Sequence, residues 1–214
     1  MIHEIRLGRY QDKLADLFNI DAIVTDPPYS ARTHSGSIES SSGIAGNYIN
    51  YVHFEESDCE EFVNFFAPRV NNWLVIFGDH KTNQWYEHYL KKAGLYVFAP
   101  VYYVKQNAMP RMQGDGPTSS VEILTRATTE KHLIEMAVAA LQKDNPRNFE
   151  LNKEDDSVIT VARHKVRVQT HKSRPGHYTA KVQIKDSMVA GQKDLETCCQ
   201  IIKDYSEPGD IVCD

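Results

Sequence analysis

The segment Asp21-Ala-Ile-Val-Thr-Asp-Pro-Pro-Tyr-Ser30 is the most informative about the fold of this chain. Its apolar run, Ala22 to Val24, is typical of a buried strand. The strand has to stop at Asp26, because the two prolines that follow have no backbone N–H and favour extended geometry. A carboxylate, free carbonyls and the ring of Tyr29 therefore follow the carboxyl end of a strand. Open α/β sheets bind their ligands at this end.

Asp26 and Pro27 supply two acceptors that suit chemistry on the exocyclic amine of a nucleobase. The lone pair of such an amine is delocalised into the ring, which makes the nitrogen a poor nucleophile. Two acceptors aimed at its two N–H bonds would draw the nitrogen toward tetrahedral geometry. Tyr29 can stack on a base that has been taken out of the helix. A turn that merely ends the strand is the alternative interpretation.

The string Asp26-Pro27-Pro28-Tyr29 resembles the motif of the amino-methylating DNA methyltransferases, which make N6-methyladenine or N4-methylcytosine. The order of motifs resembles their β-type arrangement. The resemblance implies an α/β fold with a mostly parallel, Rossmann-like methyltransferase sheet, in which residues 1–214 form one domain. It also implies S-adenosylmethionine as cofactor and double-stranded DNA as partner, with adenine favoured over cytosine N4. The residues expected to act in catalysis are Asp26, Pro27, Pro28 and Tyr29.

A second segment, Gly191-Gln-Lys-Asp-Leu-Glu-Thr197, resembles the family's stretch that usually reads Thr-Gln-Lys-Pro. In the family this stretch opens a helix beside the methionine part of the cofactor. Asp194 stands where proline is usual and can cap the helix, whose N-terminus suits a carboxylate ligand. Further along the same resemblance, Lys105, Asn107 and Ser120-Val121-Glu122 match a recurrent lysine, asparagine and Ser-x-Glu. The cofactor-binding residues expected from the resemblance are Asp26, Gln192, Lys193 and Asp214.

The last five residues, Asp210-Ile-Val-Cys-Asp214, begin a strand. In the family this strand continues into the glycine turn that holds the cofactor, and Asp214 matches the acid at the start of that turn. We therefore expect a sheet that is incomplete at the C-terminus and poor binding of S-adenosylmethionine by the chain alone. A complementing C-terminal fragment or a homodimer is the expected partner for completing the site.

Charge is distributed unevenly along the chain. The net charge is −5, yet the segment from Ser157 to Lys185 holds seven Lys and Arg and no Asp or Glu. A solvated basic face is the alternative, but with the Asp26 motif upstream we expect contacts with phosphates. Residues 125–185 are predicted to form an insertion that carries this region, although a packing helix with a polar tail is equally compatible. The residues expected to bind DNA are Arg32, Arg163, Lys165, Arg167, Lys172 and Arg174.

Composition restricts the class of protein further. A chain of 214 residues is long enough for one α/β domain. No apolar run approaches the ~18 residues of a transmembrane helix, so no membrane partner is expected. The four cysteines lack metal-ligand spacing, which predicts no metal site and a reducing, cytoplasmic compartment.

Other local patterns predict neighbouring elements. Ser57 to Glu60 reads as a capping box that opens a helix, and Trp73 to Phe77 reads as a second buried strand. Asp79 is favoured as the N-cap of a helix over 81–93, with a catalytic Asp79–His80 pair as the alternative.

Two other functions compete with DNA methylation. RNA and protein-glutamine methyltransferases orient an amine or amide nitrogen in a similar way. They usually begin the motif with Asn, however, and place the cofactor glycines before it. Asp26 near the N-terminus argues against both. The second alternative is a non-catalytic DNA-binding remnant, or one part of a split methyltransferase, which the missing glycine motif favours.

Overall fold

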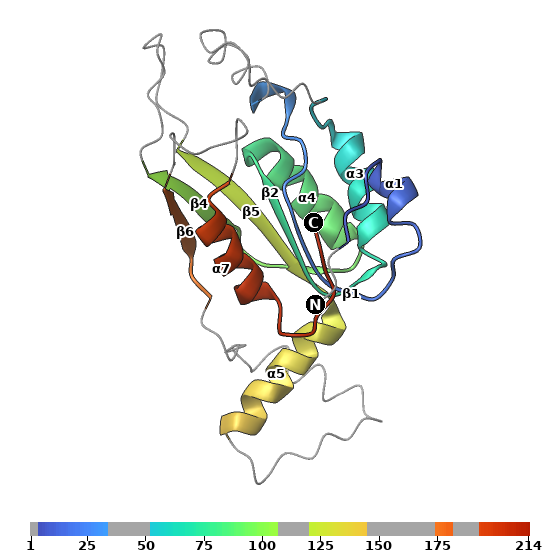
Figure 1. Cartoon of the computed structure of the whole chain (residues 1–214). Coiled ribbons are helices and arrows are strands. Elements are labelled where there is room, and N and C mark those ends of the chain that lie inside the picture. The colour runs from blue at the N-terminus through green and yellow to red at the C-terminus, as the bar shows by residue number, and fades with distance from the viewer. Residues whose placement is uncertain (1–3, 34–51, 107–119, 145–173, 182–192) are drawn as a thin grey trace.

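The computed structural model describes residues 4–33, 52–106, 120–144, 174–181 and 193–214 (Figure 1). Helices and strands alternate along the chain, as expected for an α/β fold, except for three consecutive strands over 96–128. In chain order the elements are α1 (Tyr10–Lys13), β1 (Ile20–Thr25), α3 (Glu56–Phe66), β2 (Val70–Gly78), α4 (His80–Lys92), β3 (Tyr96–Val97), β4 (Val101–Gln106), β5 (Val121–Thr128), α5 (Glu130–Asp144), β6 (His177–Lys181), α7 (Leu195–Tyr205) and β7 (Val212–Cys213).

The strands form one seven-stranded sheet in the order β6-β4-β5-β2-β1-β7, with β3 also paired to β5. β1 is parallel to β2 and β7, and β4 is parallel to β6. β5 is antiparallel to β2, β3 and β4, so all the other strands share one direction. The predicted α/β fold with a mostly parallel sheet is confirmed. Because β5 alone is reversed, it begins at the edge of the sheet where the other strands end.

Alternating residues of the central strands pack on opposite faces of the sheet. In β2, Leu74 and Ile76 join the core beneath α3 and α4, whereas Trp73 and Val75 join the core beneath α7. Figure 1 shows α7 on one face and α1, α3 and α4 on the other. A sheet covered on both faces explains why β1 and β2 read as continuous apolar runs.

β1 and β7 lie side by side, but their connecting helices cover opposite faces of the sheet. The chain leaves β1 for α3 on one face, and it enters β7 from α7 on the other face. This arrangement is a topological switch point, and in open α/β sheets the crevice at its carboxyl end is where ligands bind.

Caps define the starts of the two central helices. α3 is capped by Glu55, whose backbone N–H donates to Asp58 Oδ2 at 2.8 Å in a reciprocal capping box. The predicted Ser57–Glu60 box is therefore wrong, because Ser57 lies inside the first turn. α4 begins after Asp79, which confirms the predicted N-cap. It ends before Gly94, whose φ of +83° lies in the left-handed region that favours glycine.

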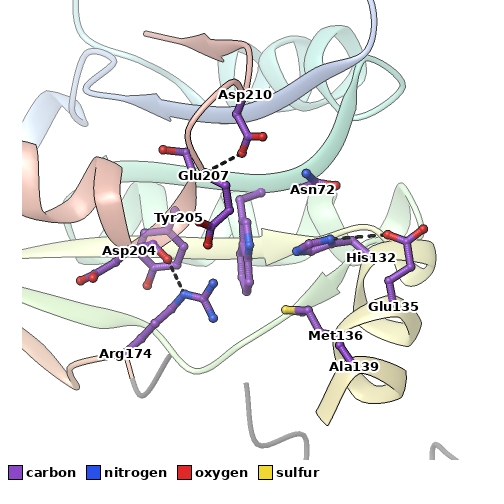
Figure 2. Close-up of a pocket in the computed structure, with 12 residues that line it drawn as sticks. Asn72, His132, Glu135, Met136, Ala139, Arg174, Asp204, Tyr205, Glu207 and Asp210 are labelled. Carbon is purple, nitrogen blue, oxygen red and sulfur yellow. Dashed lines mark hydrogen bonds and ion pairs between the residues drawn. The ribbon is translucent and has the colours of Figure 1, made fainter. Parts of the chain in front are cut away.

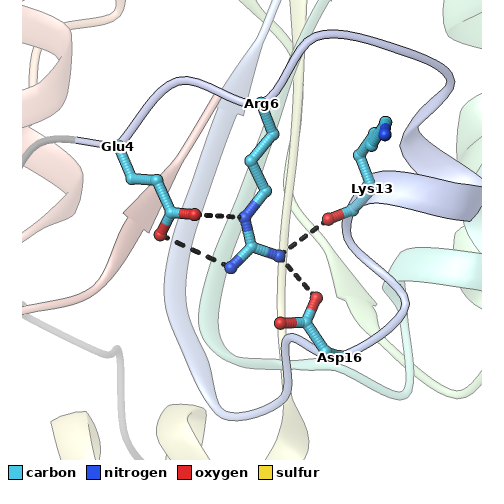
Figure 3. A network of polar contacts seen from close by, with 4 residues as sticks. All are labelled: Glu4, Arg6, Lys13 and Asp16. Carbon is cyan, nitrogen blue, oxygen red and sulfur yellow. Dashed lines mark hydrogen bonds and ion pairs between the residues drawn. The ribbon is translucent and has the colours of Figure 1, made fainter.

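The guanidinium group of Arg6 stabilises the segment before β1 (Figure 3). Arg6 Nε donates to Glu4 Oε1 at 2.7 Å, and Arg6 Nη1 donates to the Lys13 carbonyl at 2.7 Å and to Asp16 Oδ1 at 2.5 Å. One side chain thus joins the extended lead-in to both ends of the turn that follows α1.

The structure also places parts of the predicted insertion over residues 125–185. Residues 125–128 belong to β5 in the middle of the sheet, and residues 177–181 form β6. Within these bounds α5 is the described element that extends from the sheet (Figure 1). Residues 145–173 lie outside the described part of the chain. In the described ranges, no helix has the length and apolar character needed to cross a bilayer.

Candidate active site

The turn after β1 begins with Asp26 and is held by backbone contacts with the segment before α3. The N–H of Phe54 donates to the carbonyl of Tyr29 at 3.0 Å, and Ser30 forms an isolated parallel bridge with Phe54. The chain therefore leaves the sheet in the extended step expected from two consecutive prolines.

The side chains of this turn meet a lysine that is distant in sequence. Lys193 Nζ lies 2.7 Å from Asp26 Oδ2, 3.0 Å from Glu122 Oε2 and 3.2 Å from the Tyr29 hydroxyl. The Lys193 side chain is only 14% exposed, and that of Glu122 is 11% exposed. The four residues form a compact polar cluster at the carboxyl edge of the sheet.

Glu122 reaches this edge because β5 is reversed. It stands near the start of β5 and pairs in register with Tyr103 of β4, which runs the opposite way. Lys105, two residues farther along β4, makes an ion pair with Glu122 Oε1. Two carboxylates and two ammonium groups thus alternate from Asp26 through Lys193 and Glu122 to Lys105.

The charges in this cluster shift one another's protonation. Burial works against the charge of Glu122, but Lys193 and Lys105 outweigh it and hold the pKa of Glu122 below its ordinary value of 4.5. Burial likewise works against Lys193, but Glu122 and Asp26 raise the pKa of Lys193 above 10.5. Burial, then the charges of Glu122 and Asp26, raises the pKa of Tyr29 well above 10.0, so its phenol stays neutral.

These shifts predict how stability depends on pH. A carboxyl whose pKa is lowered by folding contributes its full stability above its ordinary pKa, and that contribution fades as the pH falls through the folded value. For Lys193, with a raised pKa, the contribution is complete below 10.5 and fades as the pH rises. We expect the difference in unfolding free energy between wild type and Glu122→Gln to be constant from pH 4.5 to 10.5 and to shrink outside that window. Urea unfolding at a series of pH values measures it, and a difference that grows below pH 4.5 would contradict the sign.

Asp79 joins the turn after β1 to the start of α4. Its Oδ2 accepts from the Ser30 N–H at 3.2 Å, the Ser30 hydroxyl at 2.5 Å and the Thr33 hydroxyl at 2.5 Å. Its Oδ1 accepts from the N–H groups of Lys81 and Thr82, as an N-cap does. Burial opposes the charge, but the bonds from Ser30 and Thr33 lead the group of donors that lower the pKa of Asp79. One carboxylate therefore caps α4 and fixes the segment that follows Tyr29.

Replacing Asp79 with alanine should lower the unfolding free energy by about 2 kcal/mol, because a helix cap and a shared acceptor are lost together. Asp79→Asn keeps an acceptor at the cap and should lose less. Chemical denaturation of both variants measures the difference, and equal losses would mean that the acceptor atoms do not matter.

The segment that enters α7 places Lys193 in the cluster. Asp194 caps α7 by accepting from the N–H of Thr197 at 2.9 Å, which confirms the capping role considered for it. The N–H of Asp194 itself donates to the Tyr103 hydroxyl at 3.0 Å. With Asp194 held by its side chain and by its N–H, the Lys193 side chain before it contacts Asp26. Gln192 lies outside the described residues.

Asp214 follows β7 at the same edge. Its pKa is raised, first by burial and then by the charge of Asp26, while a hydrogen bond with Thr25 lowers it. Asp26 and Asp214 thus stand at the two sides of the switch point, as the parallel pairing of β1 and β7 requires.

The predicted DNA-binding residues are not brought together within the described part of the chain. Arg32 Nη1 lies 3.2 Å from His80 Nε2, close to the turn. Arg174 lies elsewhere, with its guanidinium 4.5 Å from the Trp73 ring and 5.2 Å from the Tyr205 ring, and with Nε donating to the Asp204 carbonyl. These contacts give Arg174 a packing role, and DNA contact by it stays a prediction. Arg163, Lys165, Arg167 and Lys172 lie outside the described residues.

Arg174 lines a cavity of about 290 Å³ (Figure 2). Its other walls include Trp73 near the start of β2, His132 and Met136 of α5, and Asp210 before β7. These positions belong to the amino-terminal edge of the sheet, opposite Asp26. The cavity is therefore separate from the polar cluster at the turn, and the chemistry expected of Asp26 has no counterpart there.

Sequence reasoning found the turn and the two capping aspartates but missed the partners that surround them. Glu122 was noted only as part of a Ser-x-Glu resemblance, and its contact with Lys193 was not expected. The contacts of Ser30 and Thr33 with Asp79 were also missed. A buried carboxylate beside two lysines is visible only once the register of β4 and β5 is known.

The chain matches one protein family and is similar to several solved structures. The family model for DNA methylases of the N6 and N4 type matches residues 20–214. No curated protein matches the chain. The crystal structure of M1.HpyAVI is similar with 19% identity and a TM-score of 0.50, over 95% of this chain and 73% of that one.

Two further structures are similar to different extents. PvuII DNA methyltransferase (cytosine-N4-specific) has 10% identity and a TM-score of 0.54, over 96% of this chain and 71% of that one. The crystal structure of the M1.HpyAVI–SAM complex has 23% identity and a TM-score of 0.39 over 56% of this chain, which spans only 50% of that one. At these identities the matches with TM-scores of 0.50 and 0.54 show the fold alone. Since the family model covers residues 20–214, the chain belongs to the N6/N4 DNA methylase family.

Proposed function

We propose that this chain is an S-adenosylmethionine-dependent DNA amino-methyltransferase that acts on the exocyclic N6 of adenine, with N4 of cytosine as the second candidate base. The observation that carries the proposal is the position of Asp26 and the prolines after it. They leave β1 at the carboxyl edge of the sheet, immediately beside β7, where the topology switches faces.

In this proposal the turn orients the target amine. Asp26 and the carbonyl of Pro27 each accept one N–H of a base taken out of the duplex, which localises the nitrogen lone pair for attack. The ring of Tyr29 stacks on the base, and its raised pKa keeps the phenol neutral at physiological pH. Pro28 fixes the geometry of the turn between them. The reaction needs no covalent intermediate on the protein and no metal.

The residues at the switch point fit the chemistry of the proposed cofactor. S-adenosylmethionine carries an amino-acid end with both charges and a ribose with hydroxyl groups, and it supplies the activated methyl group. Lys193 offers a cation beside the carboxylate of Asp26, and Asp214 offers a second carboxylate at the same edge of the sheet. We propose that Asp26, Asp214 and Gln192 contact the cofactor and that Lys193 contributes to the site through Asp26, with other contacts from outside the described residues.

Contacts with DNA are proposed for the basic residues. Arg32 stands near the turn and beside His80, where it could reach a phosphate next to the extruded base. Arg163, Lys165, Arg167 and Lys172 extend the positive charge of the chain over 163–172. Because such contacts release counterions, duplex affinity should fall steeply with salt.

Titration of S-adenosylmethionine into the 214-residue chain by calorimetry, with and without duplex DNA, tests the proposal. Saturable binding that is lost in Asp214→Ala and Asp26→Ala supports it. Salt-dependent DNA binding with no cofactor binding under either condition would favour the non-catalytic, DNA-binding alternative. Addition of a candidate C-terminal fragment or analysis of dimerisation then distinguishes a split enzyme from a remnant.

A further inference from the structure

We propose that Lys193 is a positioning residue for Asp26, and that the buried carboxylate of Glu122 is what holds Lys193 in that place. The inference deepens the proposed function and rests on it for its effect on methyl transfer. The ion-pair arrangement itself rests on contacts among Asp26, Glu122 and Lys193.

Three acceptors already surround the ammonium group of Lys193 in this arrangement. An ammonium group has three N–H bonds. Lys193 Nζ lies within 3.2 Å of three acceptors, which are Asp26 Oδ2, Glu122 Oε2 and the Tyr29 hydroxyl. A lysine waiting for the carboxylate of a cofactor would keep a donor free. The resemblance to the family predicts such a role, whereas the contacts here direct Lys193 to the residues that would handle the amine.

Glu122 is too deeply buried to be an incidental surface partner of Lys193. Its side chain is 11% exposed, and it is held from the other side by Lys105. A buried carboxylate without a cation is costly, so Glu122 requires Lys193 and Lys105 as much as they require it. Its position on a sheet strand is rigid, unlike that of Lys193 on a connecting segment. The strand therefore sets where the ammonium group sits.

Lys193 orients the carboxylate of Asp26. Its ammonium group lies 2.7 Å from Oδ2, which fixes the rotation of the carboxylate. A carboxylate has about four acceptor positions, so Asp26 can hold Lys193 and still accept an N–H of a base. Glu122 would thus act through Lys193 on the geometry of Asp26, without touching the substrate.

Other titratable groups face the same cluster, and any titration has to include them. In addition to burial, the charge of Lys193 acts to lower the pKa of Tyr103 in β4 and of Cys198 in α7. The charge of Asp26 acts to raise the pKa of Asp214. Burial is the main cause that raises the pKa of each of the three, so the Tyr103 phenol and the Cys198 thiol are expected to be uncharged at neutral pH. The alternating charges of Asp26, Lys193, Glu122 and Lys105 dominate.

The test follows the side-chain NMR signal of Lys193 with pH in the complete 214-residue chain, labelled at lysine and assigned by its loss in Lys193→Arg. Glu122→Gln should lower the pKa of Lys193 by about one to three units, because a charge within ~4–6 Å is removed. Lys105→Met removes a competing cation and should leave that pKa unchanged or raise it. The matched control is Glu60→Gln, which breaks the exposed Glu60–Lys92 pair and should change nothing at Lys193.

An unchanged Lys193 pKa in Glu122→Gln, or a lowered one in Lys105→Met, would overturn the inference. Because the Lys105→Met result is independent, the inference can still be overturned if Glu122→Gln does not fold. Single-turnover methyl transfer separates this result from the proposed function. The expected pKa changes without any transfer by wild type would reject the function and retain the ion-pair assignment, whereas transfer with an unmoved Lys193 pKa would do the reverse.

Discussion

Asp26→Asn should reduce the rate of methyl transfer to duplex DNA by at least about 100-fold while duplex affinity stays the same or increases slightly. The amide that replaces the carboxylate offers one acceptor oxygen, has donors that face the amine, and has lost the charge that Lys193 balances. Loss of one preorganised electrostatic contact typically costs about 100-fold to 1,000-fold in rate. DNA affinity should not fall, because removing a negative charge does not weaken attraction to phosphates.

Rates from single-turnover assays with labelled S-adenosylmethionine, and affinities from fluorescence anisotropy at fixed salt, measure the two effects separately. Asp16→Asn is the matched control, since Asp16 is an exposed aspartate that contacts Arg6 before β1. It should leave both quantities unchanged. Undiminished transfer by Asp26→Asn would remove Asp26 from the reaction.

The second large effect is on stability. Glu122→Ala should lower the unfolding free energy by about 3–5 kcal/mol, the usual cost of removing one partner from a buried ion pair. Both Lys193 and Lys105 lose their contact with the deleted carboxylate, although Lys193 keeps Asp26. The loss should therefore fall at the lower end of that range.

Urea denaturation at neutral pH measures this loss. Glu60→Ala removes an ion pair of similar length from the surface, where such pairs contribute about 0–1 kcal/mol. A Glu122→Ala effect no larger than that of Glu60→Ala would contradict the view that the cluster is buried and mutually dependent.

Local chemistry allowed much of the fold to be predicted from the sequence. The prolines after Asp26 end β1, and the apolar run near Trp73 forms β2. In each case the deciding interaction involves residues a few positions apart. Asp79 and Asp194 cap their helices for the same reason, because a cap is a contact with the N–H groups two or three residues ahead.

The prediction of the α3 cap was wrong for an instructive reason. Ser57-x-x-Glu60 has the usual residues of a capping box, but Glu55 and Asp58 form the same reciprocal pair two residues earlier. A carboxylate can accept at the N-cap as a hydroxyl does, so two overlapping patterns competed. Packing of Cys59 and Phe62 against the core is compatible with the register observed.

The partners of the candidate site could not be predicted, since they depend on register between strands. Glu122 precedes Lys193 by 71 positions and follows Asp26 by 96, and nothing local links them. They meet because β5 is reversed and starts at the edge where β1 ends. The packing of Arg174 against the rings of Trp73 and Tyr205 could not be predicted either, because those residues are distant from it in the sequence.

One measurement shows directly whether the turn at Asp26 directs a methyl group to an exocyclic amine of DNA. The 214-residue chain is incubated with duplex DNA and S-adenosylmethionine carrying a labelled methyl group, and the nucleosides are then identified by mass spectrometry. We expect labelled N6-methyladenine, or N4-methylcytosine, in the wild-type reaction and neither product with Asp26→Asn. Salt-dependent binding of the duplex with no label on any base would contradict this expectation and identify a DNA-binding protein without this activity.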